Sequence, residues 1–158
     1  MTMMNEIPRA ITDGETILAT ADIPATPEEL YRALTTKEME TWWGAPDVYT
    51  IGDWTADLRV GGPWTLNVIL PDGNALPASG EFLELAPPNK FVLTRRYDWD
   101  APILGRKVTT VAYLLDAIEG GTRVTIRHDG FKGCAPAAYE HAYGWERLLA
   151  WLKAYFTE

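Results

Sequence analysis

Apolar residues recur at every second position along most of residues 47–128, and this pattern constrains the fold more than any other feature. Such alternation is the signature of strands that are buried on one face. One run ends at the turn Pro71-Asp72-Gly73 and places four apolar residues on the same face: Trp64, Leu66, Val68 and Leu70. Short turns join antiparallel neighbours, because parallel strands need a long crossover. The pattern predicts an antiparallel meander of about six strands.

Helical patterns stand on both sides of this meander. The segment Thr26-Pro27-Glu28-Glu29 offers an N-cap, a proline at the first helical position and acids in the first turn, so two short helices are expected near residues 27–43. A long helix is predicted over about residues 136–156, where apolar residues recur at intervals of three and four: Ala138, Ala142, Trp145, Leu149, Leu152 and Phe156.

A further strand is expected around Ile17–Ile23, before the first helix. The order of elements then predicts an α+β domain, in which a curved antiparallel sheet of six or seven strands wraps around the long C-terminal helix. Such a sheet leaves a space against the helix that side chains or a ligand must fill.

Composition narrows the class of protein. The chain has 158 residues, the length of one domain, and a formal net charge of −8 with no basic stripe, so neither nucleic acid nor an anionic membrane is an expected partner. It begins without a secretory leader and lacks a long apolar run, so a cytoplasmic location is expected. One cysteine, Cys134, and two histidines favour no disulfide, no metal centre and no cofactor.

Four segments resemble a known family in their order and spacing: residues 42–46 (WWGAP), 57–64 (DLRVGGPW), 121–128 (GTRVTIRH) and 144–152 (GWERLLAWL). They look like the START-like (SRPBCC) superfamily, in the AHSA-type branch named after activators of the ninety-kilodalton heat-shock protein ATPase. The resemblance implies the helix-grip fold. It divides the chain into an N-terminal extension, residues 1–14, and a single START-like domain, residues 15–158.

Arg95 is the most informative polar residue on the predicted inner face of the sheet. It lies in phase with Phe91, Leu93, Tyr97 and Trp99, and a charge on an apolar face is costly unless it is paired or reached by water. One interpretation is an anchor for a ligand carboxylate, phenolate or carbonyl. The alternatives are an internal ion pair with Asp57 or Glu81, or a bulge that turns Arg95 outward.

His128 shares a face with Val124 and Ile126 at the end of the last strand. It either donates to a ligand or moves a proton there, or it bonds the backbone where the strand leads to the long helix. His141 is expected to line the rim of the space or to reach solvent. Trp151 lies away from the apolar stripe of the helix and is a candidate contact for a protein partner.

These patterns favour a binding module for a small hydrophobic or aromatic molecule, held in a cavity of roughly 300–1,000 Å³ between sheet and helix. The predicted ligand-binding residues are Leu66, Val68, Phe91, Arg95, Tyr97, Trp99, Tyr113, His128, Trp145 and Leu149.

Two other classes stay open. The family name implies a chaperone-associated protein-binding domain, with a chaperone or a second copy of the chain as partner. The superfamily also implies a cyclase or dehydratase acting on an aromatic or polyketide-like substrate, with His128 as proton carrier and Arg95 as oxyanion donor. No catalytic nucleophile is marked by a motif, so an enzyme is not favoured.

Overall fold

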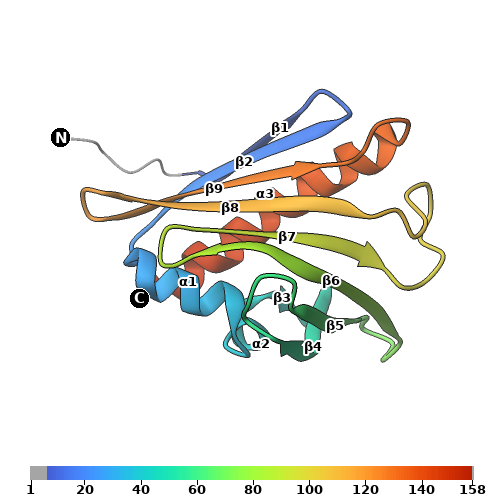
Figure 1. Ribbon diagram of the computed structural model, residues 1–158, viewed down its shortest axis with the longest axis horizontal. Coiled ribbons are helices and arrows are strands. Elements are labelled where there is room, and N and C mark those ends of the chain that lie inside the picture. Colours follow the sequence, from blue (N-terminus) through green and yellow to red (C-terminus); the bar gives the residue numbers. More distant parts are fainter. Residues whose placement is uncertain (1–6, 158) are drawn as a thin grey trace.

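The computed structural model describes residues 7–157 as a curved antiparallel sheet with one long helix, α3 (Ala135–Tyr155), crossing behind it (Figure 1). Within these residues the sheet has nine strands in the order β1-β2-β9-β8-β7-β6-β5-β4-β3. Every neighbouring pair is antiparallel. The strands are β1 (Arg9–Thr12), β2 (Thr16–Ile23), β3 (Gly44–Ala45), β4 (Tyr49–Ala56), β5 (Pro63–Ile69), β6 (Ala75–Ala86), β7 (Lys90–Tyr97), β8 (Thr109–Ile118) and β9 (Gly121–Asp129).

The predicted α+β, helix-grip class is confirmed, but the predicted number of six or seven strands is too low. Seven long strands, β2 and β4 to β9, account for the expected set, and the two short edge strands β1 and β3 are additional. β1 lies between residues 9 and 12, inside the segment predicted as an N-terminal extension, and pairs with β2. Residues 1–6 of that extension lie outside the described residues, and the domain boundary stays a prediction.

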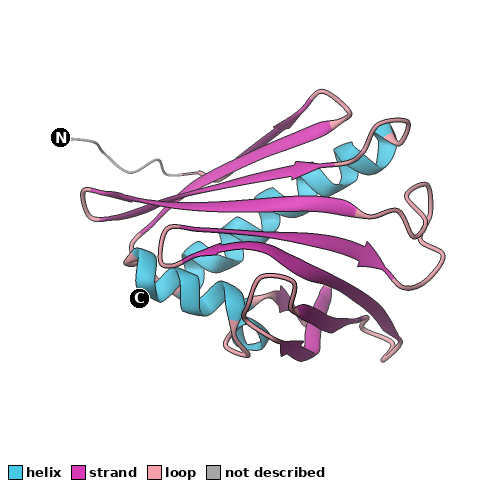
Figure 2. Cartoon of the chain, viewed as in Figure 1, coloured by secondary structure: helices cyan, strands magenta, loops and turns pink. Residues whose placement is uncertain are grey.

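Two short helices, α1 (Pro27–Thr35) and α2 (Met39–Trp42), lie where the sequence predicts them, below the long strands in the view of Figure 2. Thr26 caps α1 as expected: its hydroxyl accepts from the Glu29 backbone N–H at 3.1 Å, and the Glu29 carboxylate accepts from the Thr26 N–H at 3.0 Å. This reciprocal pair satisfies two donors that the first helical turn leaves open.

The helix α3 begins and ends within one residue of its predicted bounds and buries its apolar stripe against the sheet. One flank of α3, next to this stripe, is joined to the edge of the sheet, because the Glu146 carboxylate accepts from the Ala10 backbone N–H at 2.8 Å. Within the described residues, none of the helices has the length and hydropathy needed to cross a membrane.

Two irregularities bend the β3–β6 part of the sheet. The register shifts between Gly52 and Thr55 on β4, where Asp53 adopts a φ of 57°, and again between Phe82 and Glu84 on β6. Bulges of this kind increase local twist and curve a strand. In Figure 1 this part of the sheet turns away from the long strands.

Candidate functional site

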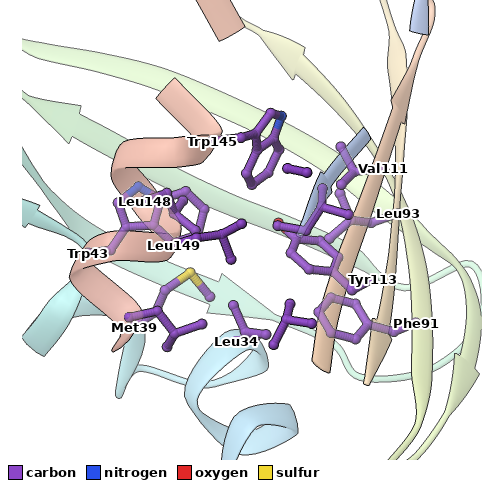
Figure 3. Packing of buried hydrophobic residues seen from close by; sticks show 14 of the residues in the cluster. Leu34, Met39, Trp43, Phe91, Leu93, Val111, Tyr113, Trp145, Leu148 and Leu149 are labelled. Carbon is purple, nitrogen blue, oxygen red and sulfur yellow. The ribbon is translucent and has the colours of Figure 1, made fainter. Parts of the chain in front are cut away.

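A cavity of about 280 Å³, partly open to solvent, lies between α3 and strands β4 to β8. Eight aromatic residues line it: Trp43, Tyr49, Trp54, Trp64, Tyr97, Trp99, Tyr113 and Trp145. Aliphatic side chains fill the gaps between the rings, and the polar members are Arg95, Glu140, His141 and Arg147. In Figure 3 the helix side chains Trp145 and Leu148 approach this region from one side and Leu93 and Tyr113 from the other. Its size lies just below the range that we expected.

Seven of the ten predicted ligand-binding residues lie on this wall: Leu66, Val68, Arg95, Tyr97, Trp99, Tyr113 and Trp145. The other three, Phe91, His128 and Leu149, are fully buried in the neighbouring core and do not reach the cavity. Phe91 shows why: it stacks on Tyr113 with ring centroids 4.4 Å apart, and the edge of Tyr31 covers it. The alternation along a strand identifies the correct face but not the position of the cavity along that face.

Arg95 lies in the cavity wall, held by aromatic side chains. Its Nη2 donates to the Tyr97 hydroxyl at 3.3 Å, and its guanidinium carbon lies 5.4 Å from the Tyr97 ring centroid and 6.0 Å from that of Trp145. Neither predicted carboxylate pairs with it: Asp57 pairs instead with Arg59 at 2.6 Å, and no ion pair joins Glu81 to Arg95. The internal ion pair, one of the alternatives for Arg95, is therefore absent from the described residues.

A short hydrogen-bonded chain continues from Arg95 to His141. The Tyr97 hydroxyl lies 2.7 Å from His141 Nε2, and His141 Nδ1 lies 2.7 Å from the Ala137 carbonyl oxygen. A carbonyl only accepts, so Nδ1 carries the proton and Nε2 accepts from Tyr97. Burial first, and then the positive charge of Arg95, lowers the pKa of His141 to about 4. His141 is thus a neutral member of the wall at pH 7.

His128 belongs to a separate, buried set of hydrogen bonds. The Trp145 indole N–H donates to its Nδ1 at 3.0 Å, so Nε2 carries the proton and donates to the Thr109 hydroxyl at 2.8 Å. The Thr109 hydroxyl donates in turn to the Arg95 carbonyl at 3.3 Å. Burial, assisted by Arg95 and His141, holds the pKa of His128 well below its usual value. His128 therefore orients Trp145 and joins α3 to the strands.

The flank of α3 that faces the cavity carries Glu140, Gly144 and Arg147. The Arg147 guanidinium carbon lies 5.3 to 5.6 Å from the ring centroids of Tyr49, Tyr143 and Trp151. Trp151 is partly buried, with its ring set edge-on to Tyr49 at 5.6 Å. This packing leaves Trp151 less free as a partner contact than its place in the helical pattern implied.

Two parts of the wall were not predicted from the sequence. The aromatic residues of β4, Tyr49 and Trp54, gave no clean alternation, because the bulge between Gly52 and Thr55 interrupts the period of two. Glu140, Gly144 and Arg147, in contrast, are spaced by four and three, the same helical period as the apolar stripe. This second stripe of helical spacing is the sequence pattern that could have identified the flank of α3 that lines the cavity. No group of three metal-ligating side chains occurs anywhere in residues 7–157.

Gly144 contributes no side chain to the cavity wall. A Cβ atom at this position would meet no atom within 4 Å, although glycine in a helix interior is less stable than alanine. We expect Gly144→Ala to raise the free energy of unfolding by about 0.5–1 kcal/mol. Urea denaturation measures this change. An unchanged or lower stability would contradict the open space described at position 144.

The two histidines predict how stability depends on pH. Both have pKa values lowered in the folded protein, so they contribute stability that is complete above the unfolded value of 6.5 and is lost as the pH falls below it. As the pH falls from 6.5 to 5, each histidine should lower the free energy of unfolding by up to about 1.4 kcal/mol per pH unit. Carboxylates titrate mostly below this window. Urea denaturation of the wild type and of His141→Gln tests this: the variant should show about half the slope, and equal slopes would contradict the assignment.

Comparison with known proteins places this geometry in a family. Residues 24–157 match the family model described as activator of Hsp90 ATPase homolog 1-like protein. The chain belongs to this family. A search of curated proteins found no match to this chain.

Solved structures of similar fold come from several bacteria. A Rhodobacter sphaeroides protein superimposes with a TM-score of 0.78 at 20% identity, over 93% of this chain and 96% of that one. Protein CV1439 from Chromobacterium violaceum gives 0.75 at 25% identity, over 90% and 96%. CalU16 from Micromonospora echinospora gives 0.63 at 21% identity, over 99% and 87%. Likeness at this identity supports the START-like fold of the family member described here.

Proposed function

We propose that this protein binds a small apolar or aromatic molecule in the cavity between the sheet and α3. The observation that carries the proposal is the wall itself, where eight aromatic side chains surround a partly open space of about 280 Å³. Binding sites for small molecules are mostly apolar clefts with a few placed polar groups. The volume lies near the lower end of the usual range, which suits a molecule of one or two rings.

Gly144 gives a direct test of the proposal. A leucine there would project from α3 into the cavity, whereas alanine adds a single methyl group in open space. Isothermal titration with 2-naphthoate and its neutral amide should show binding of at least one probe to the wild type. Gly144→Leu should weaken that binding at least about tenfold, which is 1.4 kcal/mol, and Gly144→Ala should preserve it. Failure of both probes, or binding unaffected by Gly144→Leu, would overturn the proposal.

The family description supports a second candidate, an Hsp90-ATPase-activator-like domain that binds a chaperone. The two candidates differ in what Gly144→Leu should do. A ligand site is blocked by the variant, whereas a protein contact on the outer surface is not. ATPase stimulation by the wild type and equally by Gly144→Leu, without binding of either probe, would favour the chaperone role.

The cyclase or dehydratase alternative assigned proton transfer to His128. Both ring nitrogens of His128 are engaged, by Trp145 and Thr109, and the side chain is fully buried away from the cavity. This arrangement gives no support to His128 as a proton carrier for a bound substrate.

A further inference from the structure

The polar side of the cavity has an unusual balance of charge. Its wall carries two arginines, Arg95 and Arg147, against one carboxylate, Glu140, and His141 is neutral at pH 7 because its pKa is lowered to about 4. The formal charge of the wall is thus +1, in a chain whose net charge is −8. A cleft whose net charge has one sign, and whose other walls are apolar, attracts small ions of the opposite sign.

Arg95 is the better placed of the two cations. Within residues 7–157 its guanidinium makes one hydrogen bond, a long one of 3.3 Å to Tyr97, and no ion pair. A guanidinium has five N–H donors, so most of them have no partner in the protein. The buried polar atoms without a partner include Trp99 Nε1 and Arg147 Nε but none of Arg95, so the unbonded nitrogens of Arg95 remain reachable from the cavity.

The surroundings of Arg95 would make a bound anion more strongly held than at a surface. Arg95 itself is only partly exposed and lies between the Tyr97 and Trp145 rings. Hydrogen bonds between charged groups are stronger where water is scarce. The competing carboxylate, Glu140, is exposed to solvent and forms no ion pair with Arg95. Glu140 therefore does not neutralise the charge of Arg95, which is left to pair with a ligand.

We propose that the ligand is a small aromatic carboxylic acid, bound as its carboxylate by Arg95 with its ring among the aromatic side chains. This inference rests on the proposed function and specifies its ligand class. The planar guanidinium fork matches a carboxylate, which accepts two parallel N–H bonds. Arg147, stacked among three rings at the α3 flank, adds a second positive charge to the same wall.

The test compares 2-naphthoate with 2-naphthamide, which has the same rings and no charge, by isothermal titration. The wild type should bind the acid at least about tenfold more tightly than the amide, the range expected for a hydrogen-bonded charge. Arg95→Met should abolish this preference, because it weakens binding of the acid by about tenfold more than binding of the amide. Since no carboxylate is stranded by the substitution, the fold should persist.

A matched control is available on the same strand. Arg96 follows Arg95 but lies exposed on the opposite face of β7, where it pairs with Asp98 at 2.8 Å. Arg96→Met removes the same charge and should leave the preference for the acid intact. If Arg95→Met fails to fold, Arg95→Lys keeps the charge but loses the fork and should reduce the preference.

The outcomes separate the two proposals. Equal binding of acid and amide to the wild type would overturn the carboxylate inference and leave the ligand cavity standing. Survival of the preference in Arg95→Met, or its retention in full by Arg95→Lys where Met does not fold, would overturn the role of Arg95. Binding of neither probe would overturn both the inference and the proposed function.

Discussion

Gly80→Ala is expected to lower the free energy of unfolding by about 3–5 kcal/mol, as overpacking and a lost hydrogen bond combine. A Cβ atom on residue 80 would lie 1.8 Å from the Thr94 carbonyl oxygen and 2.6 Å from Trp64 Nε1. Those two atoms are hydrogen-bonded to each other at 2.9 Å across the glycine. The added methyl group must displace the backbone of β7 or the buried indole, and either movement leaves polar groups without partners.

Urea denaturation followed by far-ultraviolet circular dichroism measures this effect, with Gly144→Ala as the matched control. The chemical change is the same in both variants, and the expected signs are opposite, because position 144 has open space and position 80 has none. Wild-type stability in Gly80→Ala would contradict the close approach of β6, Trp64 and Thr94.

His128→Ala is expected to cost a similar amount, about 3–5 kcal/mol, because it opens a cavity in the core and removes a hydrogen-bond partner. His128 is fully buried, and its loss leaves the Trp145 indole N–H without an acceptor and the Thr109 hydroxyl without a donor. Thermal or urea denaturation measures the loss. At pH 5 the difference from the wild type should be smaller than at pH 7, since the variant has no neutral histidine to keep buried.

A double-mutant cycle with Trp145→Phe isolates the hydrogen bond between the two side chains. Phenylalanine has no N–H donor, so Trp145→Phe should cost less in the His128→Ala background than in the wild type. Strictly additive free energies would show that the indole and the imidazole are not coupled, contrary to their 3.0 Å separation.

The fold could be predicted from the sequence wherever an element has its own periodic pattern. The capping residues of α1, the apolar stripe of α3 and the alternation in β5 and in β7 to β9 all correspond to the observed elements. The edge strands escaped prediction for a physical reason. β1 has four partly or fully exposed residues and β3 only two, so neither needs a buried alternating face.

The candidate site could be predicted only in part. Arg95 and Tyr97 were identified because a polar residue in phase with a buried face is conspicuous in sequence. Phe91 and His128 share that face yet lie in the core, since the cavity is placed by the bulges of β4 and β6 and by the crossing of α3. Bulges and crossing are tertiary features without a local sequence signal. The hydrogen bond between Tyr97 and His141 joins residues 44 positions apart, so it could not be predicted from the local sequence either.

Methyl chemical shifts test most directly the central claim that the space between the sheet and α3 is a ligand site. In a protein with ¹³C-labelled leucine and valine methyl groups, titration with 2-naphthoate should shift the signals of cavity-wall residues: Leu66, Val68, Leu93 and Leu148. Methyl groups buried elsewhere in the core should stay unchanged: Leu30, Leu115, Val124 and Leu152. Shifts confined to the wall, and absent in Gly144→Leu, are the predicted result. No shifts, or shifts confined to residues outside the wall, would contradict the account.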